Sequence, residues 1–593
     1  MSNVNVKING MTVSVPDGST ILDAAHVAGI KIPTLCYFKE INEIGACRVC
    51  VVEVKGARNL VAACVHPVTE GMEVQTNTPQ LVKSRKHTLE LLLSQHDRRC
   101  LSCTRSGRCE FQTLCQELGV EDEAYFHGSN PHRELDLTAP HLIRDNNKCI
   151  LCRRCTSICE KRQHVEVIGP NNRGFETQIG SPFDLGLGTT SCIHCGQCIS
   201  VCPTAALTEK SAIDEVMAAI ADPSKHVVVQ PAPSIRAALG EEFGYPVGTD
   251  VEGKMAAALR RIGFDGVFDT SFSADLTINE EAAEFMKRLN GEGPLPMFTS
   301  CSPGWVSFCE HYYPDLIDHL SSCKSPQQMF GAVVKTYYAE HKGIDAKDIV
   351  SVSIMPCTAK KYELARDDQS AAGEGIQDVD YSLTCRELAR LIRKVGINFQ
   401  QLPDEQFDDL IGESTGAGVI FGATGGVMEA ALRTAVAKLT GDDQAEISFD
   451  EMRGTADIKE ATYTVAGKTV RCAVTSGMVN AKKIMDGIRE DLAAGREPKY
   501  DFVEVMGCSG GCVTGGGQPQ CDAVTWNHTD VKGLRAKVLY DIDADKPLRK
   551  SHLNPSIIRL YEEYLGGEPG HGKAHEILHT SYVKRQINPP IED

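Results

Sequence analysis

The chain has 593 residues, more than one hydrophobic core usually holds, so we expect several domains. Its composition, 42% hydrophobic and 24% charged, is that of an ordinary soluble globular protein, and its net charge of −18 argues against a nucleic-acid-binding surface. The N-terminus shows no secretory pattern, and no stretch of about 18 uncharged apolar residues occurs, so we expect a cytoplasmic protein without a membrane span.

The 25 cysteines are the most informative feature of the composition. In a reducing compartment, cysteines at short fixed intervals are more often metal ligands than disulfide partners. Most of these cysteines fall into tight groups. The isolated ones fit ordinary buried thiols: Cys115, Cys309, Cys323, Cys385, Cys472 and Cys521.

The first domain is expected over residues 1–78. Its opening residues predict a β-hairpin with an Asn9-Gly10 turn, and Thr20 with Asp23 predicts a capping box at the start of a short helix that ends near Gly29. Four cysteines follow with the spacing C-x10-C-x2-C-x13-C: Cys36, Cys47, Cys50 and Cys64.

In this spacing a loop supplies close ligands and a distant cysteine completes the site, as in [2Fe–2S] ferredoxins. A zinc site is the alternative, but the preceding hairpin favours a [2Fe–2S] domain with a β-grasp fold.

A basic amphipathic helix is expected around residues 80–94, within a second domain at 79–125. It leads to His96, Cys100, Cys103 and Cys109. A lone histidine is usually a surface or core residue, but the neighbouring thiols favour ligation of a [4Fe–4S] cluster. A neutral imidazole in place of a thiolate tends to raise the cluster potential.

A duplicated C-x2-C-x2-C-x3-C run marks a third domain at residues 139–210. This is the bacterial two-cluster ferredoxin pattern, in which the fourth cysteine of each run ligates the other cluster. We therefore expect one [4Fe–4S] cluster on Cys149, Cys152, Cys155 and Cys202, and a second on Cys192, Cys195, Cys198 and Cys159.

From residue 211 to 525 the pattern changes to that of an α/β domain. Strand-like runs at 226–230 and 349–354 alternate with helical stretches and Gly-rich turns. Residues 416–422 mimic a dinucleotide fingerprint, but no clear strand precedes them, so tight backbone packing is the favoured interpretation.

Three short segments of this domain concentrate Cys, Gly and Pro: residues 299–305, 355–361 and 506–519. Thiolates from distant loops can converge on one site, and glycines let a bulky inorganic group approach the backbone. These considerations alone do not name a reaction.

The three segments resemble the signature motifs of [FeFe]-hydrogenases, of the types TSCCPxW, MPCxxK and C-x3-C followed by GGGxP. The preceding cluster series resembles that of the long, multi-cluster members. Residues 526–593, with Lys550-Ser-His552 and the segment 574–579, resemble the family's small subunit, fused here. The resemblance implies a multidomain α+β and α/β fold: ferredoxin-type domains followed by an α/β H-cluster domain.

The resemblance also implies the site residues. Cys357, Cys508 and Cys512 would ligate the [4Fe–4S] part of the H-cluster, with Cys512 bridging to a binuclear iron site that carries CO, cyanide and a dithiolate. Lys360 would donate a hydrogen bond to a cyanide nitrogen. The remaining lining residues would be Ala232, Pro233, Ser234, Met355 and Met506. The implied reaction is heterolytic cleavage of H2, with the chemistry carried by the cofactor.

The family's proton relay corresponds to Cys301, Glu281, Ser321, Glu284 and Arg288. Helical spacing places Glu281, Glu284 and Arg288 on one face. Taken without the motifs, such a charged face would be interpreted as solvated.

One position departs from the family pattern. The first motif usually has two adjacent cysteines, a proton donor and a cluster ligand, and here the second is Ser302. Either Ser302 ligates through oxygen, or Cys301 takes over ligation and the relay changes, or the chain is an engineered or inactive variant.

The expected cofactors are therefore one [2Fe–2S] cluster, three [4Fe–4S] clusters and the H-cluster. The expected partners are H2, protons, and ferredoxin or flavin- and NAD(P)-binding subunits in a hetero-oligomer. The competing hypothesis is a non-catalytic electron-transfer subunit like the large iron–sulfur subunit of respiratory NADH dehydrogenase, or an H2-sensing relative.

Overall fold

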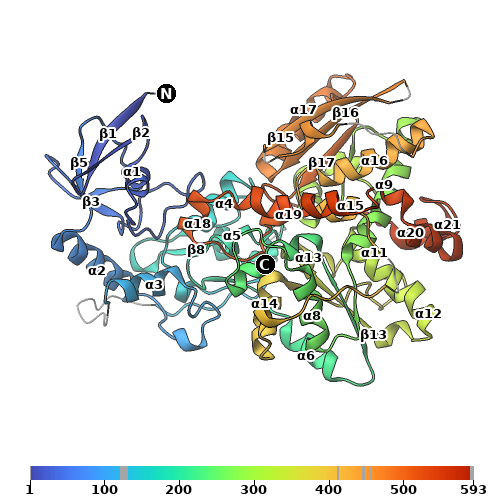
Figure 1. The fold of residues 1–593 in the computed structure, drawn as a ribbon, viewed down its shortest axis with the longest axis horizontal. Helices are drawn as coiled ribbons and strands as arrows, with labels where there is room; N and C mark the ends of the chain where they lie inside the picture. The colour runs from blue at the N-terminus through green and yellow to red at the C-terminus, as the bar shows by residue number, and fades with distance from the viewer. Residues whose placement is uncertain are drawn as a thin grey trace.

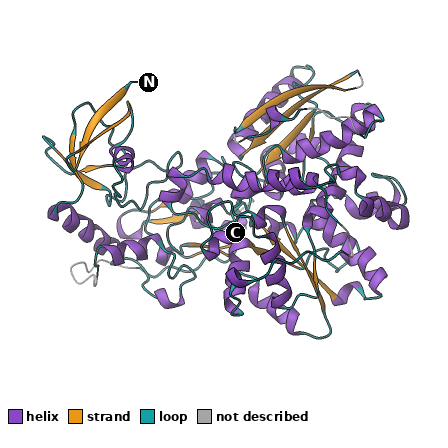
Figure 2. Ribbon diagram, in the orientation of Figure 1, coloured by secondary structure: helices purple, strands orange, loops and turns teal. Residues whose placement is uncertain are grey.

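The computed structural model describes residues 2–120, 131–409, 413–443, 448–454, 456–465 and 467–587. A small N-terminal lobe projects from a larger body, and the chain between them forms a connecting layer (Figure 1). Strands lie in the small lobe and in two separate parts of the larger body, where helices surround them (Figure 2). The mixed α/β architecture expected from the sequence is confirmed.

The small lobe is a five-stranded sheet with one helix. The strand order is β2-β1-β5-β3-β4. The predicted hairpin is present as an antiparallel pair, and the capping box forms as predicted, since Thr20 and Asp23 each accept from the other's backbone N–H. The elements are β1 (Asn3–Ile8), β2 (Met11–Pro16), α1 (Ile21–Val27), β3 (Val51–Val54), β4 (Val61–Ala62) and β5 (Glu73–Gln75).

The connecting layer contains short elements and long loops. Strands β6 and β9 of this layer pair antiparallel and bring residues 142–144 beside 207–209. The elements are α2 (Pro79–Leu93), α3 (Glu110–Glu117), β6 (Leu142–Arg144), α4 (Arg154–Lys161), β7 (Gly169–Asn171), β8 (Gln178–Gly180), α5 (Gln197–Ser200) and β9 (Leu207–Glu209).

Arg154 ties this layer to the small lobe. Its guanidinium is buried and donates to both carboxylate oxygens of Glu110, at 2.8 and 2.9 Å, and to the carbonyls of Cys36 and Tyr37. A guanidinium has five donors and no acceptor, so one side chain can hold several backbone segments in fixed positions.

Two four-stranded sheets form the larger body. One is parallel, in the order β11-β10-β13-β14, and the other has the order β12-β17-β16-β15 with a single antiparallel pair, β15 with β16. The strands predicted at 226–230 and 349–354 are confirmed as β10 and β13. The strands are β10 (His226–Pro231), β11 (Gly266–Val267), β12 (Met297–Phe298), β13 (Ile349–Met355), β14 (Tyr381–Thr384), β15 (Ile458–Val465), β16 (Lys468–Ser476) and β17 (Phe502–Met506).

Helices cover both sheets, and every residue of β13 and β17 is buried, as is usual for central parallel strands. Helix α9 lies between α11, α15 and α16. The helices of this body are α6 (Ile213–Ala221), α7 (Pro233–Arg236), α8 (Glu252–Ile262), α9 (Thr270–Leu289), α10 (Pro303–Tyr312), α11 (Pro326–Val333), α12 (Ala339–Lys342), α13 (Ala359–Glu363), α14 (Cys385–Lys394), α15 (Gly416–Val419), α16 (Gly426–Thr440) and α17 (Met478–Ala493).

The Gly-rich run at 416–422 serves packing, as predicted. A Cβ on Gly418 would lie 2.3 Å from the carbonyl oxygen of Ser271, and one on Gly422 would lie 2.5 Å from a methyl carbon of Leu539. Both contacts are too short for any side chain, so glycine is required for close approach here.

The C-terminal segment crosses the whole molecule. It contains α18 (Ala523–His528), α19 (Val531–Asp545), α20 (Pro555–Leu560) and α21 (Gly572–Leu578). Its first helix reaches the small lobe, where His528 stacks on His26 at 3.4 Å between ring centroids, and its last helix packs on α11 at the far edge (Figure 1).

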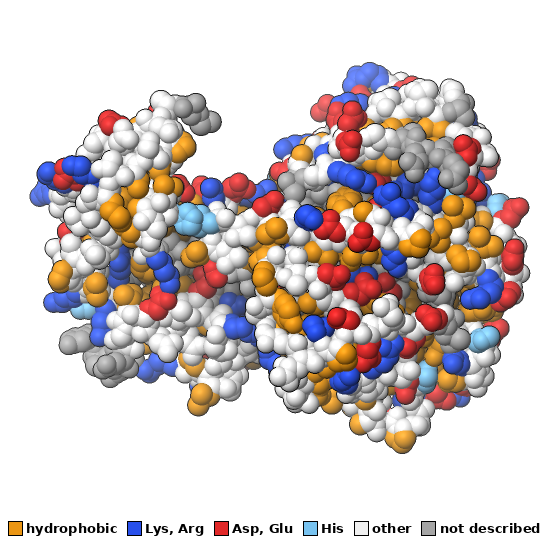
Figure 3. Space-filling model, in the orientation of Figure 1, with side chains coloured by type: hydrophobic (Ala, Val, Ile, Leu, Met, Phe, Trp, Pro, Cys, Tyr) orange, Lys and Arg blue, Asp and Glu red, His pale blue; other side chains and the backbone are white. Residues whose placement is uncertain are grey.

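Acidic and basic side chains alternate over the visible surface, and the small lobe stands apart from the larger body at the top of the view (Figure 3). None of the described helices has both the length and the apolar character that crossing a bilayer requires.

Candidate active site

Three loops that leave buried strands meet around one cavity of about 80 Å³. They follow β12, β13 and β17, and they are the three Cys-, Gly- and Pro-rich segments singled out in the sequence. The fold brings together all the lining residues that the sequence predicted for this site: Ala232, Pro233, Ser234, Cys301, Ser302, Met355, Cys357, Lys360, Met506, Cys508 and Cys512.

The donors in this cavity suit an iron–sulfur group. Burial raises the pKa of the Cys357 and Cys508 thiols and raises that of Cys512 to about 12, because charged thiolates are poorly solvated there. Lys360 acts in the opposite direction on Cys357 and Cys512. Soft thiolate ligands beside a compensating cation in an apolar cavity are the environment that an iron–sulfur cluster requires.

Glycines close the cavity from one side. A Cβ on Gly515 would lie 2.2 Å from the carbonyl oxygen of Pro356, and one on Gly511 would lie 2.7 Å from the backbone nitrogen of Thr424. The loop that carries Cys508 and Cys512 can take this path only because these positions lack side chains.

Lys360 is held at the rim by a network that the sequence did not reveal. Its Nζ lies 2.9 Å from Glu363 Oε2 and 3.2 Å from the carbonyl oxygen of Cys301. The same Glu363 oxygen accepts from Ser325 Oγ at 3.0 Å and from Gln327 Nε2 at 2.9 Å. The carboxylate therefore orients the ammonium group at the cavity.

Ser302 occupies the N-cap of α10 but does not cap it. Its hydroxyl makes no hydrogen bond to the first turn, although serine is a preferred capping residue. The hydroxyl lies 2.9 Å from where a Cβ on Gly507 would be, beside the loop of Cys508. Ser302 therefore presents an uncommitted oxygen on the cluster side of the cavity.

Cys301 faces a different neighbour. Burial raises the pKa of its thiol, and the nearby charges that add to this effect are Glu281 first and then Cys512. The thiol thus lines the cavity and has the carboxylate of Glu281 among its charged neighbours.

Helix α9 brings the predicted relay residues together. Ser321 Oγ donates to Glu284 Oε2 at 2.9 Å, and Arg288 Nη2 lies 2.5 Å from Glu284 Oε1. The alternative of a solvated charged face is wrong, because Glu281 is fully buried and Arg288 is 8% exposed. The cause is tertiary: α11 and α16 cover this helix.

Glu281 is a buried carboxyl whose two oxygens have no hydrogen-bond partner among the described residues. Burial, with a smaller contribution from Glu284, raises its pKa from 4.5 to about 8. It is therefore mostly protonated at neutral pH, which suits a group that donates and accepts protons.

The two-cluster ferredoxin segment docks directly on this site. Gln197 Nε2 donates to Cys508 Sγ at 3.0 Å and to the carbonyl of Thr514 at 2.9 Å, and Thr358 Oγ1 donates to the carbonyl of His194 at 2.7 Å. Gln197 was not predicted; the only signal was its position inside a cluster-binding run. A hydrogen bond to a ligating sulfur tunes a cluster's potential.

The structure also groups the ferredoxin cysteines as the sequence predicts. Cys149, Cys152, Cys155 and Cys202 surround a small cavity of about 20 Å³. The charges of Cys192 and Cys159 help to raise the pKa of Cys198, Cys159 does the same for Cys192, and Cys508 and Cys198 do so for Cys195.

The four N-terminal cysteines lie in two close pairs. Cys50 Sγ is 3.3 Å from Cys64 Sγ, and the Cys47 N–H donates to Cys36 Sγ at 3.4 Å. Backbone N–H donors to sulfur are a usual feature of iron–sulfur sites.

The imidazole of His96 is buried ahead of Cys100, Cys103 and Cys109. Burial lowers its pKa to about 4, so the ring is neutral at pH 7, and its Nδ1 has no hydrogen-bond partner in the described part of the chain. A neutral ring is the form that binds a metal. Among the described residues, the hydrogen bonds and ring contacts of His96 include none with these three cysteines.

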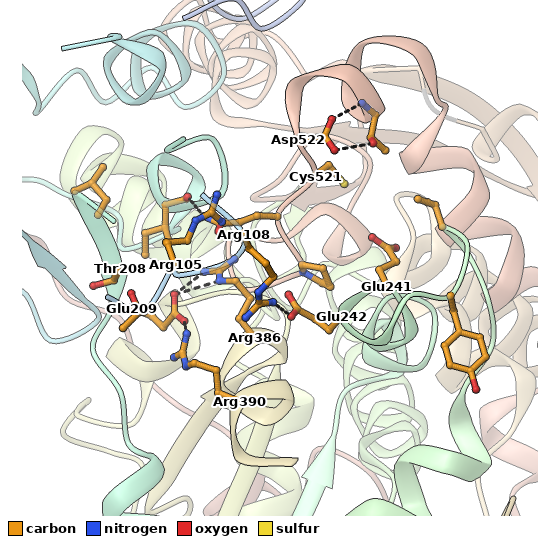
Figure 4. A pocket seen from close by; sticks show the side chains of 18 residues that line it. Arg105, Arg108, Thr208, Glu209, Glu241, Glu242, Arg386, Arg390, Cys521 and Asp522 are labelled. Carbon is orange, nitrogen blue, oxygen red and sulfur yellow. Dashed lines mark hydrogen bonds and ion pairs between the residues drawn. The ribbon is translucent and has the colours of Figure 1, made fainter. Parts of the chain in front are cut away.

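A separate arginine-lined cleft of about 260 Å³ lies where the second domain meets the larger body (Figure 4). Arg386 and Arg390 reach Glu209 at 2.9 and 2.6 Å, and Arg108 pairs with Glu242. These three arginines are thus paired with carboxylates, and the cleft lies at an interface between domains.

Comparison with known proteins relates the cysteine-lined cavity and the cluster-binding segments to one protein family. The family model for the iron only hydrogenase large subunit, C-terminal domain, matches residues 225–516. The chain is 49% identical to NADP-reducing hydrogenase subunit HndD of Solidesulfovibrio fructosivorans over 99% of this chain and 100% of that protein.

The chain belongs to the iron-only hydrogenase family. Further models match residues 1–79 (2Fe-2S iron-sulfur cluster binding domain), 85–124 (NADH-ubiquinone oxidoreductase-G iron-sulfur binding region), 148–207 (4Fe-4S dicluster domain) and 529–585 (iron hydrogenase small subunit). Iron hydrogenase 1 of Clostridium pasteurianum is 42% identical over 97% of this chain and 99% of its own length.

Solved structures agree. The [FeFe]-hydrogenase HydA1 from Chlamydomonas reinhardtii, in a variant form, matches with a TM-score of 0.56 and 43% identity, covering 63% of this chain and 99% of that chain. This iron-only hydrogenase is an enzyme that interconverts H2 with protons and electrons through a chain of iron–sulfur clusters. The alternative of a non-catalytic electron-transfer subunit is not favoured.

Proposed function

We propose that the cavity at Cys357, Cys508 and Cys512 holds the H-cluster and that the chain carries one [2Fe–2S] and three further [4Fe–4S] clusters on the predicted ligands. The observation that carries this proposal is the convergence of the three thiols, one buried and two half-buried, on one apolar cavity that has Lys360 at its rim. When bound, the H-cluster supplies heterolytic cleavage of H2.

The protein's own residues have separable roles in this proposal. Lys360, held by Glu363, donates to an anionic ligand of the cofactor. Cys301 passes a proton between the cavity and Glu281, and Ser321 and Glu284 carry it onward. Gln197 joins the neighbouring ferredoxin cluster to Cys508 for electron transfer. Ala232, Pro233, Ser234, Met355 and Met506 exclude water from the cavity.

The first test is the infrared spectrum of the full chain, produced anaerobically with [FeFe]-hydrogenase maturation factors. We expect bands of metal-bound CO and cyanide that shift under H2. No bands, under conditions that load a known hydrogenase, would remove the catalytic assignment for this chain.

We assign the fourth ligand position of the cubane to Ser302, because its hydroxyl is uncommitted and lies beside the Cys508 loop, whereas Cys301 faces Glu281. Accordingly, Cys301→Ala should retain the infrared bands and the cubane's electron paramagnetic resonance signal. It should lower H2 turnover by about 10²- to 10⁴-fold, the usual contribution of a positioned proton donor.

Ser302→Cys should retain turnover and shift the reduction potential of the cubane, because the ligand changes from oxygen to sulfur. Cys309→Ala is the matched control, since this buried thiol of α10 contacts only the carbonyl of Tyr313 among the described hydrogen-bonding partners. Loss of the cubane signal in Cys301→Ala would instead make Cys301 the ligand.

The electron partner is proposed from the relatives. The Solidesulfovibrio protein is named as a subunit of an NADP-reducing hydrogenase. We infer that this chain works in a hetero-oligomer with flavin- and NAD(P)-binding subunits, or with ferredoxin. The proposed domains are residues 1–78, 79–125, 139–210, 211–525 and 526–593.

A further inference from the structure

We propose that the proton relay has a second branch, which leaves Glu284 through Ser322 and His579 and ends at Glu280 and the exposed His575. His575 and His579 belong to the fused C-terminal segment, which would thereby complete a proton exit for the catalytic body. The inference rests on the proposed function of the cavity.

From Glu284 to Glu280 the branch is a continuous series of hydrogen-bonding atoms. Ser322 Oγ lies 3.3 Å from Glu284 Oε2 and 2.8 Å from His579 Nδ1. On the other side of the ring, His579 Nε2 lies 2.9 Å from Glu280 Oε2. The rings of His579 and His575 are 4.5 Å apart between centroids, and His575 is exposed. Hydrogen bonds therefore join the buried relay to Glu280, and the exposed ring of His575 lies beside the last donor, His579.

Backbone contacts hold His579 in place independently of its side chain. The Thr580 N–H donates to the Ser322 carbonyl at 2.7 Å, and the Lys324 N–H donates to the Leu578 carbonyl at 2.9 Å. These two bonds join the segment after α21 to the loop before α11. Substitution of the imidazole should thus leave the chain path intact.

Each link moves one proton and breaks one O–H or N–H bond as the next forms. Protonated Glu284 donates to Ser322 Oγ, Ser322 donates to His579 Nδ1, and His579 releases its Nε2 proton to Glu280 or toward His575. Nothing is oxidised or reduced. The charged and titratable groups that face this ring are Glu280, Glu284, Lys287, Cys323, Tyr561 and His575.

The predicted relay ends differently. Arg288 is its outermost member, and a guanidinium keeps its proton at working pH. Arg288 also donates to the carbonyl of Leu320 at 2.8 Å, so it is fixed in place. His579, in contrast, has one ring nitrogen toward Ser322 and the other toward Glu280, so it can accept a proton on one side and release one on the other.

The test uses the matured full-length enzyme in three variants: His579→Gln, Ser322→Ala and the control His552→Gln. His552 is a close match because its Nδ1 also meets a hydroxyl, that of Thr434 at 3.1 Å, and its Nε2 also meets a carboxylate, that of Asp443 at 3.2 Å. His552 has no contact with Glu284 among those the structure describes.

Exchange of D2 with water protons is measured across pH, since it depends on proton movement and needs no electron partner. We expect His579→Gln and Ser322→Ala each to slow exchange about 3- to 30-fold, to change the pH profile in the same way, and not to add in the double variant. His552→Gln should match the wild type.

A second readout is independent of turnover. Infrared difference spectra should show the carboxyl bands of Glu284 shifted in Ser322→Ala and His579→Gln and unchanged in the control. Equal exchange rates and pH profiles in all the variants would overturn the branch. Absence of CO and cyanide bands in the wild type would instead mark failure of the proposed function.

Discussion

Replacing Cys512 by Ala should abolish H2 turnover. We expect a loss of at least about 10⁶-fold, the lower end of enzymatic accelerations, because the substitution removes the thiolate proposed to join both parts of the cofactor. Infrared bands of CO and cyanide should disappear from the anaerobically matured protein, while the spectroscopic signals of the N-terminal clusters remain.

Cys385→Ala is the matched control for this experiment. Burial raises the pKa of Cys385 to about 12, as it does for Cys512, but Cys385 begins α14 and does not line the cavity. Its replacement should cost about 1 kcal/mol of stability and leave turnover intact. Retention of the bands in Cys512→Ala would contradict the proposed ligand set.

Replacing Glu281 by Gln should lower H2 turnover by about 10²- to 10⁴-fold without changing the infrared bands, since an amide cannot relay a proton in place of a carboxyl. Because the pKa of Glu281 is about 8, H2 evolution in the wild type should fall as pH rises through that value and the donor is lost. H2 oxidation should rise over the same interval. Both dependences should be absent in Glu281→Gln.

The same group links stability to pH. Its pKa is raised from 4.5 to about 8 by folding, so the native state keeps a proton that the unfolded chain releases. The contribution of Glu281 to stability is therefore present below about pH 4.5 and is lost as pH rises through about 8. The unfolding temperature of Glu281→Gln, measured across pH, should lack the fall in stability that Glu281 causes in the wild type.

The control for both measurements is Glu292→Gln, because Glu292 is an exposed carboxylate three residues beyond α9. It should retain wild-type turnover and the wild-type pH dependence. A Glu281→Gln enzyme as fast as this control would remove Glu281 from the relay.

Local spacing was sufficient to predict the cluster-binding half of the protein. The paired ferredoxin runs predict which cysteines meet, because three ligands of each cluster lie within a few residues on one loop and the duplicated pattern identifies the fourth in the other run. The N-terminal hairpin and the capping box at Thr20 and Asp23 were likewise predicted, since both depend on residues adjacent in sequence. The parallel strands β10 and β13 were predicted as strand-like runs rich in valine and isoleucine.

Tertiary structure alone decided which polar groups are buried and which side-chain oxygens have no hydrogen-bond partner among the described residues. The relay face of α9 has the sequence pattern of a solvated helix, and only the helices packed on it show otherwise. Gln197 and Cys508 are separated by 311 residues, and Glu280 and His579 by 299, so no local pattern could join them. The sequence by itself determined the ligand types and the family. It could not determine the proton path, because burial and long-range hydrogen bonds depend on how distant elements pack.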